Sequence, residues 1–282
     1  MTRSTAFGGH PLHVGGRPEP GPVALHAGPL ERFREVEARQ VRPWLTPGCR
    51  LLDIGAGSGY QSRLFHEYGC DVTAIDVEVD HDASLFWPVQ LFDGVRLPFS
   101  DRSFDVVFTS NVMEHVREPT RLLREVGRVV KPDGRVIHIV PSASWRVWTS
   151  VARGVHGART ILGVGQGSPS SRSQPDSSDG GRPRAVKARK RSVSDLLFGP
   201  PHGEFASTLG EVRAYRRSAW LGRLTAGGFR SVFTAGNGLF YTGYTLCPRL
   251  SIAWRRRLAS VLGSSCHVFV LQPAPRGPNG RD

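Results

Sequence analysis

The sequence has few cysteines and lacks long apolar runs. Its four cysteines, Cys49, Cys70, Cys247 and Cys266, include no closely spaced pair, which argues against a disulfide framework or a metal site. We therefore expect reduced thiols and no metal. No stretch reaches the roughly 18 apolar residues of a membrane span, and the first 22 residues contain no apolar signal-peptide core. These absences predict a soluble, cytoplasmic protein.

Acidic residues are also scarce relative to basic ones. Lys and Arg number 37 against 24 Asp and Glu, which gives a formal net charge of +13. The excess is local, because residues 163–195 hold seven basic residues against three Asp, and residues 249–257 hold four Arg and no acid. Such runs are usually solvated faces, and residues 163–195 lack the aromatic side chains that stack on bases. Nucleic acid is therefore not an expected partner.

Three segments lack any regular apolar pattern. Residues 1–28 are rich in Gly, Pro and His, and residues 273–282 form a polar tail. Of the 33 residues in 163–195, 23 are Gly, Pro, Ser, Lys or Arg. Segments of this composition cannot bury enough apolar surface to offset the entropy lost on ordering. We expect disorder at both ends and a single domain over residues 29–272, interrupted by a flexible basic insertion at 163–195.

Within the domain, short apolar runs alternate with helical patterns. A first helix is expected from residue 29, starting at a proline and ending before Pro47-Gly48. Because strands separated by helices need crossover connections, the pattern predicts an α/β fold. The expected sheet is Rossmann-like and doubly wound, mostly parallel, with an antiparallel last strand. The expected strands are 49–55, 71–76, 89–93, 103–110, 134–140, 229–243 and 266–273, and the later helices are 58–69, 118–130, 144–162, 217–229 and 251–263.

The stretch LLDIGAGSGY, residues 51–60, places three glycines after the first expected strand. Gly55, Gly57 and Gly59 permit a tight turn and close approach of a ligand to the backbone. Their spacing is neither the GxGxxG of dinucleotide sites nor a P-loop. Asp53, expected at the mouth of the site, would repel a pyrophosphate and attract a cation such as a sulfonium. Asp76, at the end of the second strand, suits the hydroxyls of a ribose in either type of cofactor.

Three further motifs follow this loop in order. They are VTAIDVE, LFDGVRLPFSDRSFDVVFTSNVMEHV and EPTRLLREVGRVVKPDGRVIHIVPS. Together with the glycine loop they resemble the class I S-adenosylmethionine-dependent methyltransferases, in particular the small-molecule group with the LPF…FDVV…EHV run. The resemblance covers about residues 50–142, a third of the chain. This chain departs from the group at Val95, where an acid is common, and in KPDG, where KPGG is common.

The resemblance implies S-adenosylmethionine as cofactor and a role for each matching residue. Asp76 would bind the ribose, Val77 would lie against the adenine, and Asp93, beside Gly94, would meet the adenine amino group. Asp93 is equally suited to capping a turn before residues 97–99, where Leu97 and Phe99 suit the core. Ser110 and Asn111 would close over the cofactor, and its methionine part would be lined by Asp53, Gly55, Ala56, Gly57 and Gly59.

A general base would assist methyl transfer to a hydroxyl. The candidates with side chains able to take a proton are His115, His138, His202, Glu204 and Tyr215. His202 and Glu204 stand two residues apart, so in an extended segment they would face the same way. His115 also suits a helix surface or cap.

Two expected helices, 144–162 and 251–263, combine Trp, aliphatic residues and Arg. Their apolar faces are expected to cover the sheet, although such helices also suit an anionic membrane surface or a lipid-linked acceptor. The sequence thus predicts a methyltransferase acting on a small-molecule or lipid-linked acceptor, at oxygen, with peripheral membrane contact as an option. An NAD-dependent oxidoreductase and a non-catalytic cofactor-binding module stay open as alternatives. The acceptor and the oligomeric state are left open.

Overall fold

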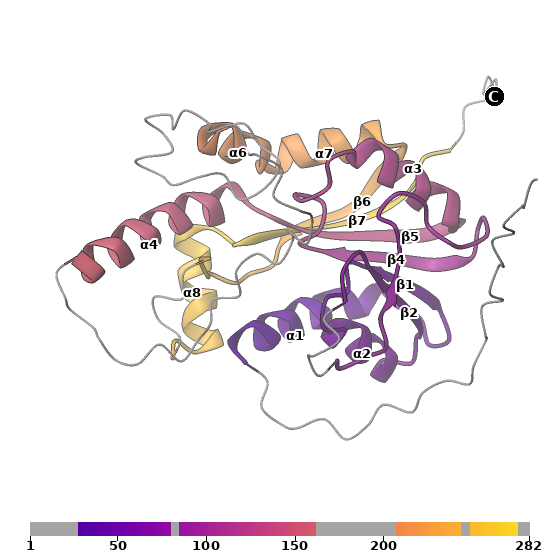
Figure 1. The fold of residues 1–282 in the computed structure, drawn as a ribbon, viewed down its shortest axis with the longest axis horizontal. Coiled ribbons are helices and arrows are strands. Elements are labelled where there is room, and N and C mark those ends of the chain that lie inside the picture. The colour runs from indigo at the N-terminus through magenta and orange to yellow at the C-terminus, as the bar shows by residue number, and fades with distance from the viewer. Residues whose placement is uncertain (1–27, 80–84, 162–206, 244–248, 276–282) are drawn as a thin grey trace, which may run out of the picture.

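A computed structural model describes residues 28–79, 85–161, 207–243 and 249–275 (Figure 1). The predicted insertion 163–195 lies outside these residues, as does the predicted N-terminal segment apart from Gly28. The predicted disorder of these segments, and the division of the chain into domains, therefore stay predictions. What the structure describes is the sheet and the helices that surround it.

Seven strands form one sheet in the order β3-β2-β1-β4-β5-β7-β6. The pairs β1–β2, β1–β4, β2–β3 and β4–β5 are parallel, whereas β7 is antiparallel to both β5 and β6. The predicted Rossmann-like, mostly parallel sheet with an antiparallel last strand is confirmed. The strands are β1 Arg50–Ile54, β2 Asp71–Asp76, β3 Gln90–Leu91, β4 Phe104–Ser110, β5 Val130–Pro141, β6 Phe229–Gly236 and β7 Cys266–Pro273.

Helices lie on both sides of this sheet. In Figure 1, α1 and α2 lie on one side of the strands, α3 and α7 lie on the other, and α4 and α8 lie beyond one end. A short helix, α6, was not expected from the sequence. The helices are α1 Pro29–Val41, α2 Tyr60–Glu67, α3 Pro119–Val129, α4 Ala143–Ile161, α6 Thr208–Ala214, α7 Arg217–Ala226 and α8 Ile252–Leu262, with a 3-10 turn η1 at Arg42–Trp44.

Side chains that point alternately to the two faces of the sheet form two hydrophobic cores, one on each face. In β1, Leu51 packs with Phe65 of α2, whereas its neighbour Leu52 packs in the cluster that contains Leu123 of α3 and Trp220 of α7. Successive side chains of a strand point to opposite faces, so a strand covered on both sides is apolar throughout. This is why the buried strands were readable as continuous apolar runs.

The apolar face predicted for α4 was expected to cover the sheet, but the structure turns part of it to solvent. Val147 and Val151 are 44% and 47% exposed, whereas Arg146 is buried. The Arg146 guanidinium donates to Glu211 of α6 and, at 3.1 Å, to Oγ1 of Thr208. A buried charge must be paired, so this ion pair fixes which side of α4 faces inward. The pairing partner lies far along the chain and leaves no periodic signal in the sequence.

Candidate cofactor site

The three glycines of the loop between β1 and α2 all adopt the left-handed conformation. Their φ angles are +74° at Gly55, +54° at Gly57 and +74° at Gly59. L-residues with a Cβ reach this region at a cost of about 1–2 kcal/mol. A Cβ on Gly55 would overlap Val112, and one on Gly59 would lie 2.8 Å from the carbonyl oxygen of Trp87, whereas one on Gly57 would meet no atom within 4 Å. Gly57 therefore faces open space beside the loop.

These differences predict separable effects for two alanine substitutions. Gly57→Ala should lower the free energy of unfolding by about 1–2 kcal/mol, the cost of its backbone conformation. Gly55→Ala should cost about 1–3 kcal/mol more, because the added methyl group must displace Val112. Urea unfolding of the two variants measures both values. Equal losses of unfolding free energy in the two variants would show that the contact with Val112 does not constrain residue 55.

Asp76, the last residue of β2, ties the glycine loop to the strand. Its Oδ2 accepts from the amide of Gly57 at 2.8 Å, and its Oδ1 accepts from the amide of Val77 at 2.7 Å. Oδ1 also accepts from the amide of Glu78 at 3.4 Å, whereas Oδ2 keeps a second lone pair that can accept from a ligand. The contact with a ribose hydroxyl stays a prediction.

A cavity of about 730 Å³ opens at the carboxyl ends of β1, β2 and β4. The order of the sheet reverses at β1, between β2 and β4, which is where doubly wound folds bind ligands. The wall combines apolar and charged side chains. It is lined by Ile54, Gly55, Asp76, Val77, Phe92, Asp93, Gly94, Val95, Asn111, Val112, His115, Val116, Arg117, Glu118, Arg121 and Leu122.

Asp93 caps a turn, and its contact with an adenine amino group stays a prediction. Its Oδ1 accepts from the amides of Val95 and Arg96 at 2.8 and 2.9 Å, which caps the turn before the buried Leu97. These backbone bonds, that of Arg96 first, lower the pKa of Asp93 below its ordinary value. No described residue donates to its other oxygen, Oδ2, while the residue itself lines the cavity. A donor on a ligand, such as an amino group, suits that oxygen.

Asp53 does not stand at the mouth of the site, so this part of the sequence interpretation is wrong. The residue is 2% exposed, and its Oδ2 accepts from Oγ of Ser62 on α2 at 2.6 Å. Burial raises the pKa of Asp53 to about 7. A half-neutral, buried carboxyl gives little charge with which to select a cation. Its role as a cofactor contact remains a proposal.

The raised pKa of Asp53 predicts a pH dependence of stability. The folded protein holds this proton more tightly than the unfolded chain, whose Asp titrates near 3.8. Asp53 therefore favours folding below about pH 4, and this contribution is lost as the pH rises towards 7. In Asp53→Asn, the change in unfolding free energy between pH 4 and pH 8 should differ from that of the parent protein by about 2–4 kcal/mol. Asp133→Asn, at an exposed position of β5, serves as the control, and identical pH profiles for Asp53→Asn and the parent would contradict the burial of a titrating carboxyl.

A residue that the sequence analysis missed, Arg34 of α1, organises the end of β4. Its guanidinium donates to Oγ of Ser110 at 2.8 Å and to the buried Glu37 at 2.9 Å. With the amide of Asn111 oriented so that its oxygen faces Arg34, that oxygen accepts from Nη2 at 3.2 Å. Asn111 is also held at φ +55°, a conformation that asparagine tolerates better than most residues. Arg34 thus positions Ser110 and Asn111.

His115 is the candidate base that the structure places at the cavity wall. Its Nε2 lies 4.0 Å from Oε1 of Glu114, a carboxyl whose other oxygen is buried with no hydrogen-bond partner. Burial raises the pKa of Glu114 to about 8. The pair offers an accessible imidazole next to a proton-bearing carboxyl, which is an arrangement suited to proton transfer.

The other candidate bases are not at this cavity. His138 is buried in β5 with Nδ1 2.7 Å from Oγ1 of Thr109, and burial lowers its pKa to about 4. Tyr215 is buried, and its hydroxyl donates to Glu211 at 2.9 Å. Burial raises the pKa of Tyr215. Neither group can exchange a proton with a ligand there, so both predictions are wrong. His202 and Glu204 lie outside the described residues.

Most of the predicted cofactor residues come together. Gly55, Asp76, Val77, Asp93, Gly94 and Asn111 line the cavity with His115, whereas Asp53, Ala56, Gly57, Gly59 and Ser110 lie outside its lining. The groups of this cavity fit an adenosyl ligand, because the carboxylates of Asp76 and Asp93 can accept hydrogen bonds and the apolar side chains can pack against a flat ring. In the described part of the chain, no group of His, Cys, Asp and Glu could hold a metal ion, and no helix is long and apolar enough to cross a membrane.

Comparisons with known proteins match the same region. Residues 52–138 match the family model of the methyltransferase domain. The chain is 32% identical over 155 residues to glycine/sarcosine/dimethylglycine N-methyltransferase of Actinopolyspora halophila, covering 49% of this chain and 26% of that protein. It is 32% identical over 126 residues to demethylmenaquinone methyltransferase of Renibacterium salmoninarum, covering 40% of this chain and 49% of that protein. The chain thus spans a quarter to a half of the length of these curated relatives.

A solved structure supports the fold over a larger part of the chain. It is the complex of the Haloferax volcanii Trm112 methyltransferase activator with a methyltransferase, matched at 13% identity and a TM-score of 0.50 over 88% of this chain and 92% of that chain. At this identity the likeness concerns the fold alone. Residues 52–138 thus match a methyltransferase domain, and the fold around them is one that a methyltransferase of known structure shares.

Proposed function

We propose that the protein transfers the methyl group of S-adenosylmethionine to an oxygen atom of a small-molecule or lipid-linked acceptor. The observation that carries this proposal is the cavity at the carboxyl ends of β1, β2 and β4, where Asp76, Asp93 and the glycine loop converge. When bound, the cofactor supplies a methyl group activated by its sulfonium. The protein then mainly has to hold donor and acceptor close together and aligned, which can contribute roughly 7–11 kcal/mol.

Within this proposal, each residue has a task set by its surroundings. Asp76 accepts from the ribose, Val77 packs against the adenine, and Asp93 accepts from its amino group. Gly55, Ala56, Gly57 and Gly59, with Asp53 beneath them, shape the methionine part of the site. Arg34 holds Ser110 and Asn111 in position over it. The tie between Asp76 and Gly57 keeps the loop in its left-handed conformation before a ligand arrives.

His115 is the proposed general base for a hydroxyl acceptor. It lines the cavity near its rim, where a second molecule can approach, and Glu114 lies directly behind it. When Glu114 is ionised, its carboxylate stabilises the imidazolium that forms as His115 takes up the acceptor's proton. An acceptor that reacts at oxygen needs this proton to be removed. His202 and Glu204 stay proposals for the same role.

The curated relatives support a small or lipid-linked acceptor, because one is named for glycine, sarcosine and dimethylglycine and another for demethylmenaquinone. We propose a cytoplasmic location, with contact to a membrane surface considered below. The direct test supplies S-adenosylmethionine with a labelled methyl group, together with fractionated extracts of polar metabolites and of quinone lipids. Label should enter one fraction, on an oxygen atom. No incorporation in any fraction, despite cofactor binding, would support a non-catalytic cofactor-binding module instead.

A further inference from the structure

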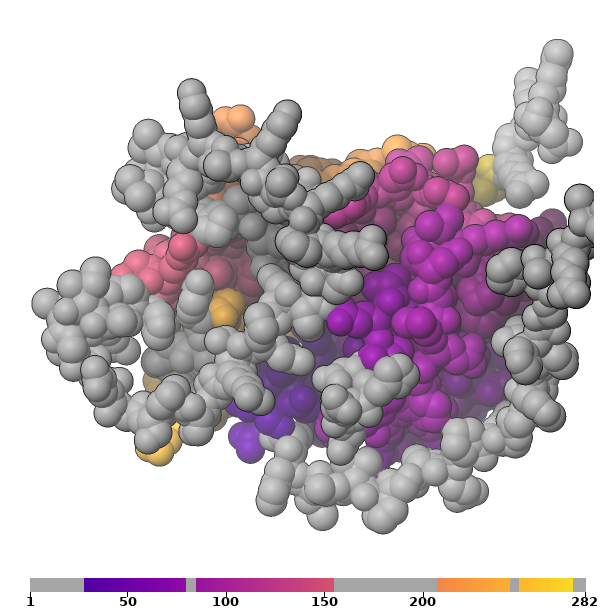
Figure 2. Space-filling view, viewed as in Figure 1, coloured from indigo at the N-terminus to yellow at the C-terminus, as the bar shows by residue number. Residues whose placement is uncertain are grey.

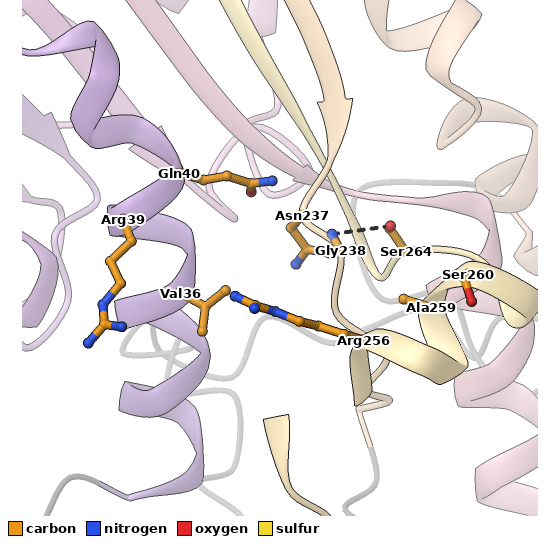
Figure 3. A pocket seen from close by; sticks show the side chains of 9 residues that line it. All are labelled: Val36, Arg39, Gln40, Asn237, Gly238, Arg256, Ala259, Ser260 and Ser264. Carbon is orange, nitrogen blue, oxygen red and sulfur yellow. Dashed lines mark hydrogen bonds between the residues drawn. The ribbon is translucent and has the colours of Figure 1, made fainter. Parts of the chain in front are cut away.

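A basic groove lies between α1 and α8 and shares no lining residue with the cofactor cavity. It consists of two neighbouring cavities of about 550 and 450 Å³, the first of which is shown in Figure 3. We call the two together the α1–α8 groove. The first is lined by Val36, Arg39, Gln40, Asn237, Gly238, Arg256, Ala259, Ser260 and Ser264. The second is lined by Pro29, Arg32, Phe33, Arg249, Leu250, Ser251, Ile252 and Arg255.

The spacing of the residues explains why arginines gather here. Arg32, Val36, Arg39 and Gln40 recur at intervals that place them on one face of α1. Figure 3 shows the side chain of Arg256 extending from α8 across the cavity towards Val36. Within the lining of the first cavity, the amide of Gly238 donates to Oγ of Ser264 at 3.2 Å. Helices far apart in the sequence thus bring their cationic faces to one groove.

The positive charge of this groove is only partly neutralised by acidic side chains. Five arginines line it, and neither of its cavities is lined by an acidic side chain. Two of the five have partners: Arg39 pairs with Glu35 at 2.5 Å, and the buried Arg255 donates to the carbonyl oxygen of Leu250 at 3.1 Å. Arg32, Arg249 and Arg256 are exposed, and no side chain among the described residues forms an ion pair with them. Three cations are therefore available to an anionic ligand.

Apolar side chains stand on the helices that form the groove. Trp254 of α8 is 54% exposed, with the guanidinium of Arg257 lying 5.0 Å above its ring, and Val261 is 82% exposed. Leu30, at the start of α1, is also exposed. At 100° per residue, Trp254 and Val261 lie on the face of α8 opposite to Ile252, Arg256 and Ala259, so they do not line the groove.

We propose that the α1–α8 groove binds the phosphate groups of an anionic lipid bilayer. Guanidinium groups recognise phosphates through charge-assisted, often bidentate, hydrogen bonds. Charge complementarity favours this partner, because basic residues are attracted to the negative surface potential of such membranes. Arginines line both cavities of the groove, and this spread favours a surface that carries many phosphates over a single phosphate ion. The proposal concerns location and does not depend on methyl transfer.

The test measures co-sedimentation of the full chain with vesicles of phosphatidylcholine alone and with 30% phosphatidylglycerol, a composition of about one anionic lipid in three. The test variant combines Arg32→Gln, Arg249→Gln and Arg256→Gln. A matched control removes the same charge from exposed arginines on the other side of the sheet: Arg124→Gln, Arg213→Gln and Arg216→Gln. Circular dichroism and the melting temperature show that both variants fold.

The expected result is binding to the anionic vesicles only, weakened about a hundredfold in the groove variant, since each basic residue near the surface contributes roughly a fivefold factor. The control variant should lose at most a few-fold in affinity. Equal losses in the two triple variants would overturn the proposal in favour of unspecific attraction. Saturable binding of inorganic phosphate without vesicle binding would also overturn it, as would the absence of any binding.

Discussion

Replacing Asp76 with alanine is expected to weaken the binding of S-adenosylmethionine about a hundredfold or more. Two losses combine in this variant. The carboxylate no longer accepts from the ribose, and the amide of Gly57 loses its acceptor at 2.8 Å, so the loop is no longer tied to β2. Hydrogen bonds to charged groups contribute about 1.5–3 kcal/mol each, and two of them account for a hundredfold change.

The measurement is a calorimetric titration of S-adenosylmethionine into the purified variant. Asp133→Asn, at an exposed position of β5 that does not line the cavity, should bind as tightly as the parent protein. Asp76→Asn should fall between the two, because its amide keeps one acceptor oxygen but turns a donor towards the loop or the ligand. A loss of less than about tenfold in Asp76→Ala would show that this carboxylate is not a principal cofactor contact.

Replacing His115 with alanine is expected to lower the methyl-transfer rate by about 10²–10⁴-fold, the usual contribution of general acid–base catalysis. Cofactor affinity should change little, because the predicted cofactor contacts are carried by other residues of the wall. The rate is measured with the acceptor that takes up label in the metabolite fractions. His66→Ala, which removes an exposed histidine from α2, is the matched control.

An unchanged rate in His115→Ala would assign proton removal to another group, with His202 and Glu204 as the next candidates. Glu114→Gln refines the result. If Glu114 stabilises the protonated His115, this variant should alter the pH profile of the rate while leaving cofactor affinity as it is. A purely structural role for Glu114 would instead lower stability and leave the pH profile unchanged.

Much of the sheet was predictable because its strands are covered on both faces. Leu51 and Leu52 enter different cores, yet each is apolar for the same reason, so β1 reads as one uninterrupted run. The part of the chain from β3 to α3 is shown in purple and magenta in Figure 2. Its residues Asp93, Asn111 and His115 were predictable because they stand in motifs that follow one another in the same order as in the methyltransferases. Local geometry, such as the glycine loop, follows from residues close together in the sequence.

The features that were missed depend on contacts between distant residues. Asp53 was expected at the mouth of the site because it lies just before the glycine loop, but it is buried and its carboxylate accepts from Ser62 of α2. Arg34 belongs to no motif, and only the fold brings it to Ser110. The inward side of α4 is decided by Glu211, which lies 65 residues beyond Arg146. No periodicity in the sequence can report such pairs.

The central claim is that the cavity at the ends of β1, β2 and β4 is built for S-adenosylmethionine and not for a dinucleotide. Calorimetric titration of the parent protein with S-adenosylmethionine, and separately with NAD, tests it most directly. We expect saturable binding of one S-adenosylmethionine per chain, weakened about a hundredfold or more by Asp76→Ala, and no heat of binding with NAD. Saturable binding of NAD, or no binding of S-adenosylmethionine by the folded chain, would contradict it.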